Sequence, residues 1–199
     1  MTDALKLGLD LALVRLNDAD SILYPAAVAD ADDLFRRLRD EIPWRQEYLS
    51  LFGRRIAQPR LTAYQGDVPY TYSGLTLPAA PWHPILAALR DQCAARAGVA
   101  FNSVLANLYR DGGDSMDWHA DDEAELGPSP VVASVSLGAA RRFQMRRKDR
   151  RGEAHCLTLE HGDLLIMAGR SQLDWLHRVP KTKRPLGPRI NLTFRAVTP

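Results

Sequence analysis

Polar and apolar side chains alternate in the segment RINLTFRA, which covers residues 189–196. Successive side chains of a β-strand face opposite sides, so Arg189, Asn191, Thr193 and Arg195 share one face. The two arginines lie roughly 20 Å apart along that face, with an amide and a hydroxyl between them. Because a guanidinium pairs with a carboxylate through two parallel hydrogen bonds, this face is suited to a small dicarboxylate held at both ends.

A candidate metal-binding group lies upstream, in the segment DGGDSMDWHADDE. In an extended segment His119 and Asp121 point to the same side and can bind one ion. His177, which follows the apolar segment DLLIMAG, is the best candidate for a second imidazole. Two histidines and one carboxylate are typical of non-haem Fe(II) oxygenases, which keep adjacent metal positions open for a chelating co-substrate and O₂.

The cysteines argue against structural zinc as the alternative. A structural zinc site usually takes four protein ligands, often thiolates in closely spaced pairs. The chain has two cysteines, Cys93 and Cys156, and no Cys-x-x-Cys pair. So few thiols also indicate a reducing compartment, and the cytoplasm is the expected location.

Two helices are predicted in the first half of the chain. In DADDLFRRLRDEI (30–42) apolar residues recur at helical spacing, and Asp30 or Asp32 is expected to be the N-cap. PWHPILAALRDQCAARAG (81–98) has a proline near its start, one apolar stripe, and Gly98 at its end. Between these helices the sequence predicts loops and short strands.

From about residue 101 the pattern changes to short alternating segments separated by glycine and proline. These segments are SVLANLY, PVVASVSLGA, RFQMRR, AHCLTLEHG, DLLIMAG and RINLTFRAV. Strands at this spacing are typical of a β-sandwich or barrel. We therefore expect one α+β domain over residues 1–199, with helices mainly in residues 1–100 packed outside a β core formed by residues 101–199.

The basic residues are concentrated in the C-terminal half. The net charge is only +2, but residues 141–151 and 181–195 together contain twelve basic residues and one acidic residue. This distribution favours binding to a phosphate backbone, although a solvated basic loop is the simpler alternative. No apolar run approaches the roughly 20 residues that span a bilayer, and the N-terminal segment does not resemble a signal peptide, so no membrane association is expected.

Taken together, His-x-Asp, the distant histidine and R-x-N-x-T-x-R resemble the AlkB family of Fe(II)- and 2-oxoglutarate-dependent dioxygenases, and within it the branch of AlkB homologue two. The similarity extends from about residue 52 to residue 195. It implies a double-stranded β-helix, or jelly roll, with helices outside. It also implies Fe(II), 2-oxoglutarate and O₂ as cofactors, with His119, Asp121 and His177 as the iron ligands.

The same resemblance implies roles for residues on the strands. Arg189 would bind the distal carboxylate of 2-oxoglutarate with Asn107 and Tyr109, while Asn191, Thr193 and Arg195 would serve the end near the metal. The segment YTYSG resembles the family's nucleotide-recognition lid. The residues implied near the damaged base are Tyr70, Tyr72, Ser73 and Glu123. The simpler alternatives are tyrosines packed between helix and sheet and a surface position for Glu123.

DNA contacts are implied in several loops. Phe52 resembles the wedge that fills the gap left by a flipped base, although an ordinary turn with a buried ring is the alternative. The basic residues implied to contact DNA are Arg60, Arg146, Lys181, Lys183 and Arg184. Glu153 and Thr182 depart from the basic residues that the family has at these positions.

The implied reaction is oxidative demethylation of 1-methyladenine and 3-methylcytosine in DNA, which releases formaldehyde, succinate and CO₂. The cationic lesions would suit an acidic pocket that contains Asp121 and Glu123, and the blocked Watson–Crick edge makes base flipping easier. The expected partner is alkylated single- or double-stranded DNA, with RNA as a further candidate, and a monomer is expected. The alternatives are a hydroxylase of RNA, protein or lipid with the same chemistry, and a metal-stabilised nucleic-acid-binding module without catalysis.

Overall fold

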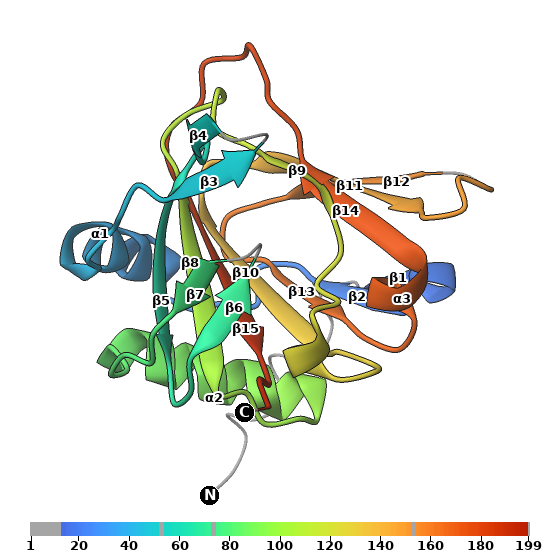
Figure 1. The fold of residues 1–199 in the computed structure, drawn as a ribbon, viewed down its shortest axis with the longest axis horizontal. Helices are drawn as coiled ribbons and strands as arrows, with labels where there is room; N and C mark the ends of the chain where they lie inside the picture. Colours follow the sequence, from blue (N-terminus) through green and yellow to red (C-terminus); the bar gives the residue numbers. More distant parts are fainter. Residues whose placement is uncertain (1–12, 52–53, 73–74, 153, 199) are drawn as a thin grey trace, which may run out of the picture.

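Two facing antiparallel β-sheets form the body of the protein in the computed structural model, which describes residues 13–51, 54–72, 75–152 and 154–198 (Figure 1). The major sheet has the strand order β1-β2-β13-β10-β15-β8-β5 and the minor sheet has the order β12-β11-β14-β9. This is the predicted jelly-roll architecture. No helix in the described ranges is both long enough and apolar enough to cross a membrane.

The bounds of the elements follow the sequence pattern. The major sheet consists of β1 (Val14–Leu16), β2 (Ser21–Tyr24), β5 (Leu61–Gly66), β8 (Ser103–Tyr109), β10 (Val132–Gly138), β13 (Leu164–Met167) and β15 (Arg189–Arg195). The minor sheet consists of β9 (Met116–His119), β11 (Arg141–Arg147), β12 (His155–Leu159) and β14 (Trp175–Val179). Two hairpins, β3 (Tyr48–Leu51) with β4 (Arg54–Ala57) and β6 (Tyr70–Tyr72) with β7 (Leu75–Leu77), stand apart from both sheets.

The two predicted helices are present as α1 (Ala31–Glu41) and α2 (Pro84–Ala97). The start of α2 is capped by His83, whose Nδ1 accepts the N–H of Ile85 at 3.3 Å, and the helix ends at Gly98 with φ +71°. Asp30 occupies the N-cap position of α1, but it has φ +52° and its side chain makes no capping hydrogen bond. The predicted N-cap position is therefore confirmed, but the side-chain hydrogen bond of an aspartate cap is absent.

β15 lies inside the major sheet, between β10 and β8, and its successive side chains face two different environments. Ile190, Leu192 and Phe194 belong to the core that includes buried residues of α1 and α2. The intervening polar residues 189, 191, 193 and 195 are also buried, although they lie on the opposite face. That face is turned toward the minor sheet, so a polar layer lies inside the protein between the sheets.

The sheet extends further into the N-terminal half than expected. β2 pairs with β13 and β5 pairs with β8, so both belong to the major sheet although they precede residue 101. Their pairing partners are distant in sequence, which explains why local patterns placed them outside the β core. The predicted sites Phe52 and Ser73, and the departure at Glu153, lie outside the described residues.

Candidate active site

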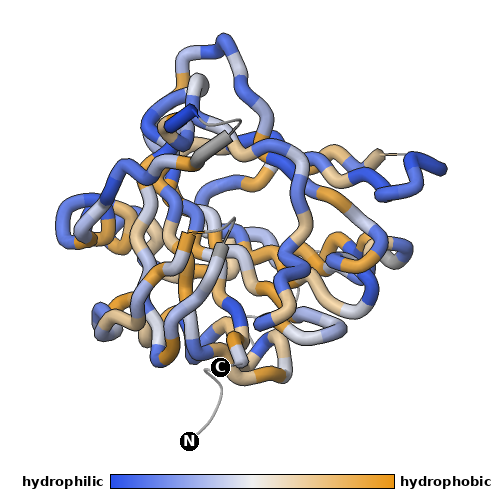
Figure 2. The backbone as a smooth tube through the Cα atoms, viewed as in Figure 1, coloured by the Kyte–Doolittle hydropathy of each residue, from blue (hydrophilic) through white to orange (hydrophobic). Residues whose placement is uncertain are grey.

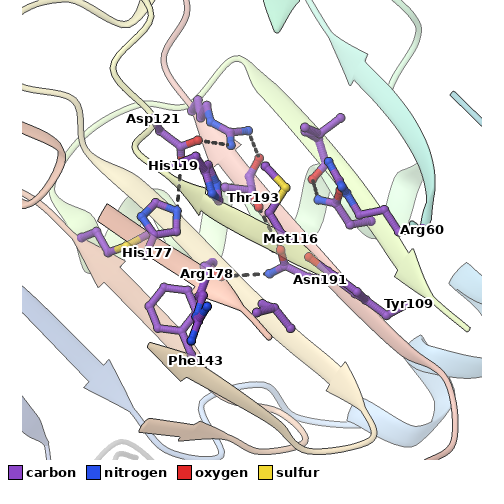
Figure 3. Close-up of a pocket in the computed structure, with 16 residues that line it drawn as sticks. Arg60, Tyr109, Met116, His119, Asp121, Phe143, His177, Arg178, Asn191 and Thr193 are labelled. Carbon is purple, nitrogen blue, oxygen red and sulfur yellow. Dashed lines mark hydrogen bonds and ion pairs between the residues drawn. The ribbon is translucent and has the colours of Figure 1, made fainter. Parts of the chain in front are cut away.

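Three predicted metal ligands converge between the two sheets (Figure 3). His119 on β9 and His177 on β14 are directly opposite each other in the ladder, and their ring centroids are 4.2 Å apart. Asp121 follows two residues after the end of β9. One potential ligand atom from each of the three side chains lies within 4.8 Å of the other two, which is close enough for all three to bind one ion.

Both histidines are held as neutral ligands. The Nδ1 atom of His119 lies 2.8 Å from the carbonyl oxygen of Asp117. Since a carbonyl only accepts, Nδ1 carries the proton and Nε2 keeps a lone pair for a metal. Burial lowers the pKa of His119 and lowers that of His177 to about 3, so neither imidazole has a tendency to take up a proton near neutral pH.

Asp121 is fully buried and ionised. Burial by itself would raise its pKa, but the charge and hydrogen bond of Arg195, together with the charges of His177 and His119, outweigh that effect and the pKa falls to about 2. Arg195 donates from Nη2 to Oδ1 of Asp121 at 2.8 Å. The second oxygen, Oδ2, has no hydrogen-bond partner among the described residues and lies 4.0 Å from Nε2 of His177.

These donors fit an Fe(II) ion. Two neutral imidazoles and one ionised carboxylate form the mixed nitrogen and oxygen set that non-haem iron favours. The unpaired Oδ2 of Asp121 would be costly to bury without a cation beside it. The residues therefore satisfy the chemistry of the predicted metal on grounds that are independent of sequence similarity.

A buried guanidinium lies further along β15. Arg189 is 1% exposed, donates from Nη2 to Oγ of Ser136 at 2.9 Å, and lies over the ring of Tyr109 at 5.3 Å. Its Nε and Nη1 have no hydrogen-bond partner in the part of the chain that the structure describes. Burial lowers the pKa of Arg189 to about 10. A buried cation with two open donors is a site for a carboxylate.

The middle of the polar row is pre-arranged by neighbouring strands. Asn191 donates to Oγ of Ser134 at 2.8 Å, and Thr193 donates to Oδ1 of Asn191 at 3.1 Å. Across the other edge of β15, Asn191 is paired in register with Asn107. Asn107, Tyr109, Asn191, Thr193 and Arg195 all line the cavity that also contains the three metal-binding side chains.

Arg60, which the resemblance implies as a DNA contact, lies inside the protein and not on its surface. It is 3% exposed, lines the same cavity, and donates from Nε to Oδ1 of Asn107 at 2.7 Å. This position follows from the register of β5 on β8. Thr62 is paired with Asn107, so Arg60, which comes directly before β5, lies beside the cavity. Figure 3 shows Arg60 on the side of the pocket opposite His177.

Two of the predicted base-contacting residues, Tyr70 and Glu123, lie near the metal-binding group. Tyr70 is buried, its ring stacks on Tyr64 with centroids 6.0 Å apart, and the guanidinium of Arg195 lies 5.6 Å from its centroid. Glu123 is partly buried and lines a second cavity of about 620 Å³ together with His119. Burial raises the pKa of Glu123, and the charge of Asp121 raises it further. The structure describes the backbone of Tyr72 in β6 but not its side chain.

Of the predicted basic residues in the C-terminal half, Lys181 lines this second cavity. Lys181, Lys183 and Arg184 are exposed in the long loop between β14 and β15, which is hydrophilic in Figure 2. Arg146 is only partly exposed because its guanidinium stacks on Trp118, 4.1 Å from the ring centroid. Arg178 stacks on the same ring at 4.4 Å.

Sequence reasoning missed several residues that build the site. Ser134 and Ser136 on β10 and Gln172 on the short helix α3 (Ser171–Asp174) hydrogen-bond to predicted site residues. The alternation in PVVASVSLGA places both serines on one strand face, and this signal could have indicated them. Gln172 offers no comparable signal, because its contact depends on tertiary structure.

Comparisons with known proteins agree with this geometry. The model of the 2OG-Fe(II) oxygenase superfamily matches residues 22–195. The chain is 48% identical to alkB homolog 3 of Bos taurus, and the match covers 85% of this chain and 63% of that protein. It is 46% identical to alkB homolog 3 of Homo sapiens, and that match covers 89% of this chain and 66% of that protein. It is 42% identical to the DNA oxidative demethylase ALKBH2 of Homo sapiens, over 85% of this chain and 69% of that protein.

The fold comparison points the same way. The solved structure of OsALKBH1 superposes with a TM-score of 0.65 at 18% identity, covering 93% of this chain and all of that one. Identity at that level supports the shared fold alone. The chain spans slightly less than two thirds of the length of the alkB homolog 3 proteins.

Proposed function

This chain belongs to the AlkB family within the 2OG-Fe(II) oxygenase superfamily, and from that premise we propose that it is a DNA repair dioxygenase that demethylates N-alkylated bases. One observation carries the proposal. The buried cluster of His119, Asp121 and His177 lies at one end of β15, and the buried Arg189 with open donors lies at the other. A redox metal and an oxoacid co-substrate would therefore have their ligands along the same buried face of β15.

The protein side chains bind and orient the reactants. His119, Asp121 and His177 would hold Fe(II), and the neutral state of the histidines keeps their lone pairs available. When bound with 2-oxoglutarate and O₂, the iron supplies the oxidising chemistry that converts the keto acid to succinate and CO₂ and hydroxylates a methyl group on a base nitrogen. The hydroxymethyl group then leaves as formaldehyde and the base is restored.

Arg189 would bind the distal carboxylate of 2-oxoglutarate. Its open Nε and Nη1 can make the bidentate pair that a guanidinium forms with a carboxylate, with Ser136 holding Nη2 and Tyr109 beside it. Asn191 and Thr193 would help at the end near the metal. Arg195 has a different principal contact, the carboxylate of Asp121, so it orients that metal-binding side chain and would help to bind the end of the co-substrate near the metal.

The cavity of about 620 Å³ would receive the flipped base. It shares His119 and Arg60 with the metal pocket, so a base placed there would face the iron. The acidic Glu123 at its wall favours a cationic lesion such as 1-methyladenine or 3-methylcytosine. Relatives named as DNA oxidative demethylases support DNA as the substrate.

The basic loop around Lys183 and Arg184 would contact the phosphate backbone beside that cavity. Alkylated single strands and duplexes are both candidate substrates, and RNA is a further one. We also propose that the protein is a monomer and acts in the cytoplasm.

The decisive experiment uses matched oligonucleotides that carry a single 1-methyladenine or 3-methylcytosine, as single strands, duplexes and RNA. We expect iron-dependent restoration of the base, with formaldehyde and succinate formed in equal amounts, followed by mass spectrometry. His177→Ala is the inactive control. Equal succinate formation with undamaged DNA, or none with any lesion, would overturn the assignment. Phe52→Ala tests the wedge, because a loss confined to duplex substrate is expected if the ring replaces the flipped base.

A further inference from the structure

Gln172 is a completely buried glutamine beside the metal-binding group. A buried side-chain amide is costly unless its donors and its acceptor are used. Its Oε1 accepts the backbone N–H of Asp121 at 2.9 Å, and its Nε2 lies 3.6 Å from the sulfur of Met167. The buried amide therefore connects the backbone of a metal-binding residue to the major sheet.

The backbone N–H of Asp121 depends on this contact because the strand has already ended. β9 stops at His119, so a ladder partner no longer holds the chain two residues later. An N–H can only donate, so the acceptor facing it must be the oxygen of Gln172, which fixes the orientation of the amide. Arg195 holds the other side of Asp121 through Oδ1. These two contacts leave Oδ2 directed toward His177.

The short helix that carries Gln172 is itself anchored. The N–H of Arg170 donates to Oδ2 of Asp20 at 2.8 Å, and the N–H of Lys148 donates to the carbonyl oxygen of Asp174 at 2.7 Å. α3 continues directly into β14, which places His177 five residues after Gln172. The same segment thus carries one metal-binding residue and holds the backbone of another.

We propose that Gln172 is a positioning residue of the metal centre, which sets the place of Asp121 relative to His177 through the hydrogen bond from the Asp121 amide. The inference rests on the proposed metal site. Partners of this kind around a metal typically change affinity by about 10- to 100-fold when they are removed, although they do not touch the ion.

Metal binding tests this role without requiring turnover. Titration of the purified apoprotein with Mn(II), followed by calorimetry, measures the affinity, and the visible absorption of bound Co(II) reports the coordination geometry. We expect Gln172→Met to bind Mn(II) about 10- to 100-fold more weakly and to alter the Co(II) spectrum. Gln172→Glu keeps an acceptor at the same distance and should recover most of the lost affinity.

Ser171→Ala is the matched control, because Ser171 is equally buried on the same helix and its Oγ has no partner among the described residues. It should bind Mn(II) like the wild type. If Gln172→Met does not fold, Gln172→Asn removes the same contact with a smaller change in packing and decides the question. Wild-type Mn(II) affinity in whichever of Gln172→Met and Gln172→Asn folds would overturn the role of Gln172. Failure of Gln172→Glu to recover the lost affinity would overturn it as well. Absence of metal binding by the wild type would instead overturn the proposed function.

Discussion

The two ends of β15 contain arginines in opposite states. Arg195 is buried against the carboxylate of Asp121, while Arg189 is equally buried and keeps two donors without a partner in the described structure. The pKa values differ accordingly, since burial lowers that of Arg189, whereas at Arg195 the combined effects of Asp121, Tyr70 and Glu123 outweigh burial and the pKa rises. At one end the guanidinium is already paired with a protein carboxylate, and at the other it has open donors that a bound anion could use.

Removal of a metal-binding side chain should have the largest effect. His177→Ala takes away one of the three metal-binding side chains at the Arg195 end of β15, so we expect demethylation to fall by at least about 1000-fold. Turnover on a methylated oligonucleotide measures the loss of activity, and Mn(II) titration measures the accompanying loss of metal affinity. Activity within tenfold of the wild type would mean that the iron is held elsewhere.

The paired arginine should be essential for stability. Arg195→Met leaves the carboxylate of Asp121 buried without its cation, and breaking a buried ion pair in this way costs about 3–5 kcal/mol. Denaturant unfolding of the apoprotein measures this change. Arg195→Met with wild-type stability would show that the pair contributes less than its burial suggests.

The unpaired arginine should behave in the opposite way. Arg189→Met removes the anchor for 2-oxoglutarate, so we expect its KM to rise about 100-fold, equivalent to two charge-assisted hydrogen bonds. The same substitution removes a buried charge that lacks a counter-ion, so the apoprotein should become more stable by about 1–2 kcal/mol. Steady-state kinetics and denaturant unfolding are the two measurements. A loss of stability like that of Arg195→Met would remove the distinction between the two ends.

The smallest effect is expected at the exposed rim. Lys183→Ser removes one exposed charge from the β14–β15 loop, so DNA affinity should fall only several-fold. The slope of log affinity against log salt should decrease by about one, because one fewer counter-ion is released. Fluorescence anisotropy between 50 and 200 mM salt, chosen as the roughly physiological range, measures both changes. An unchanged slope would place Lys183 away from the phosphates.

The polar wall of the pocket could be predicted because strand alternation is a local property. Once β15 is identified, residues 189, 191, 193 and 195 must share a face, and the structure places all four between the sheets. The apolar stripe of α2 and its termination at Gly98 were predictable for the same reason. His119 and Asp121 are close in sequence, so their shared direction could also be anticipated.

Residues whose positions depend on strand register could not be predicted. Arg60 was predicted as a DNA contact, but its buried position in the cavity depends on the pairing of β5 with β8, which no local pattern indicates. Gln172 belongs to a four-residue helix with no periodicity to reveal it, and its contact joins residues 51 positions apart. β9 and β14 are short and contain several polar residues, so the strand pairing that sets His119 opposite His177 has no clear local signature.

The central place of β15 also bears on how the metal centre matures. β15 follows every other described strand in the chain, yet β8 and β10 become neighbours only through it. Non-local pairing of this kind forms late, because a long loop must close before any contact compensates for the lost entropy. Iron should therefore bind only after β15 has paired with β8 and β10. An incompletely folded chain would then not hold a redox-active ion where solvent can reach it.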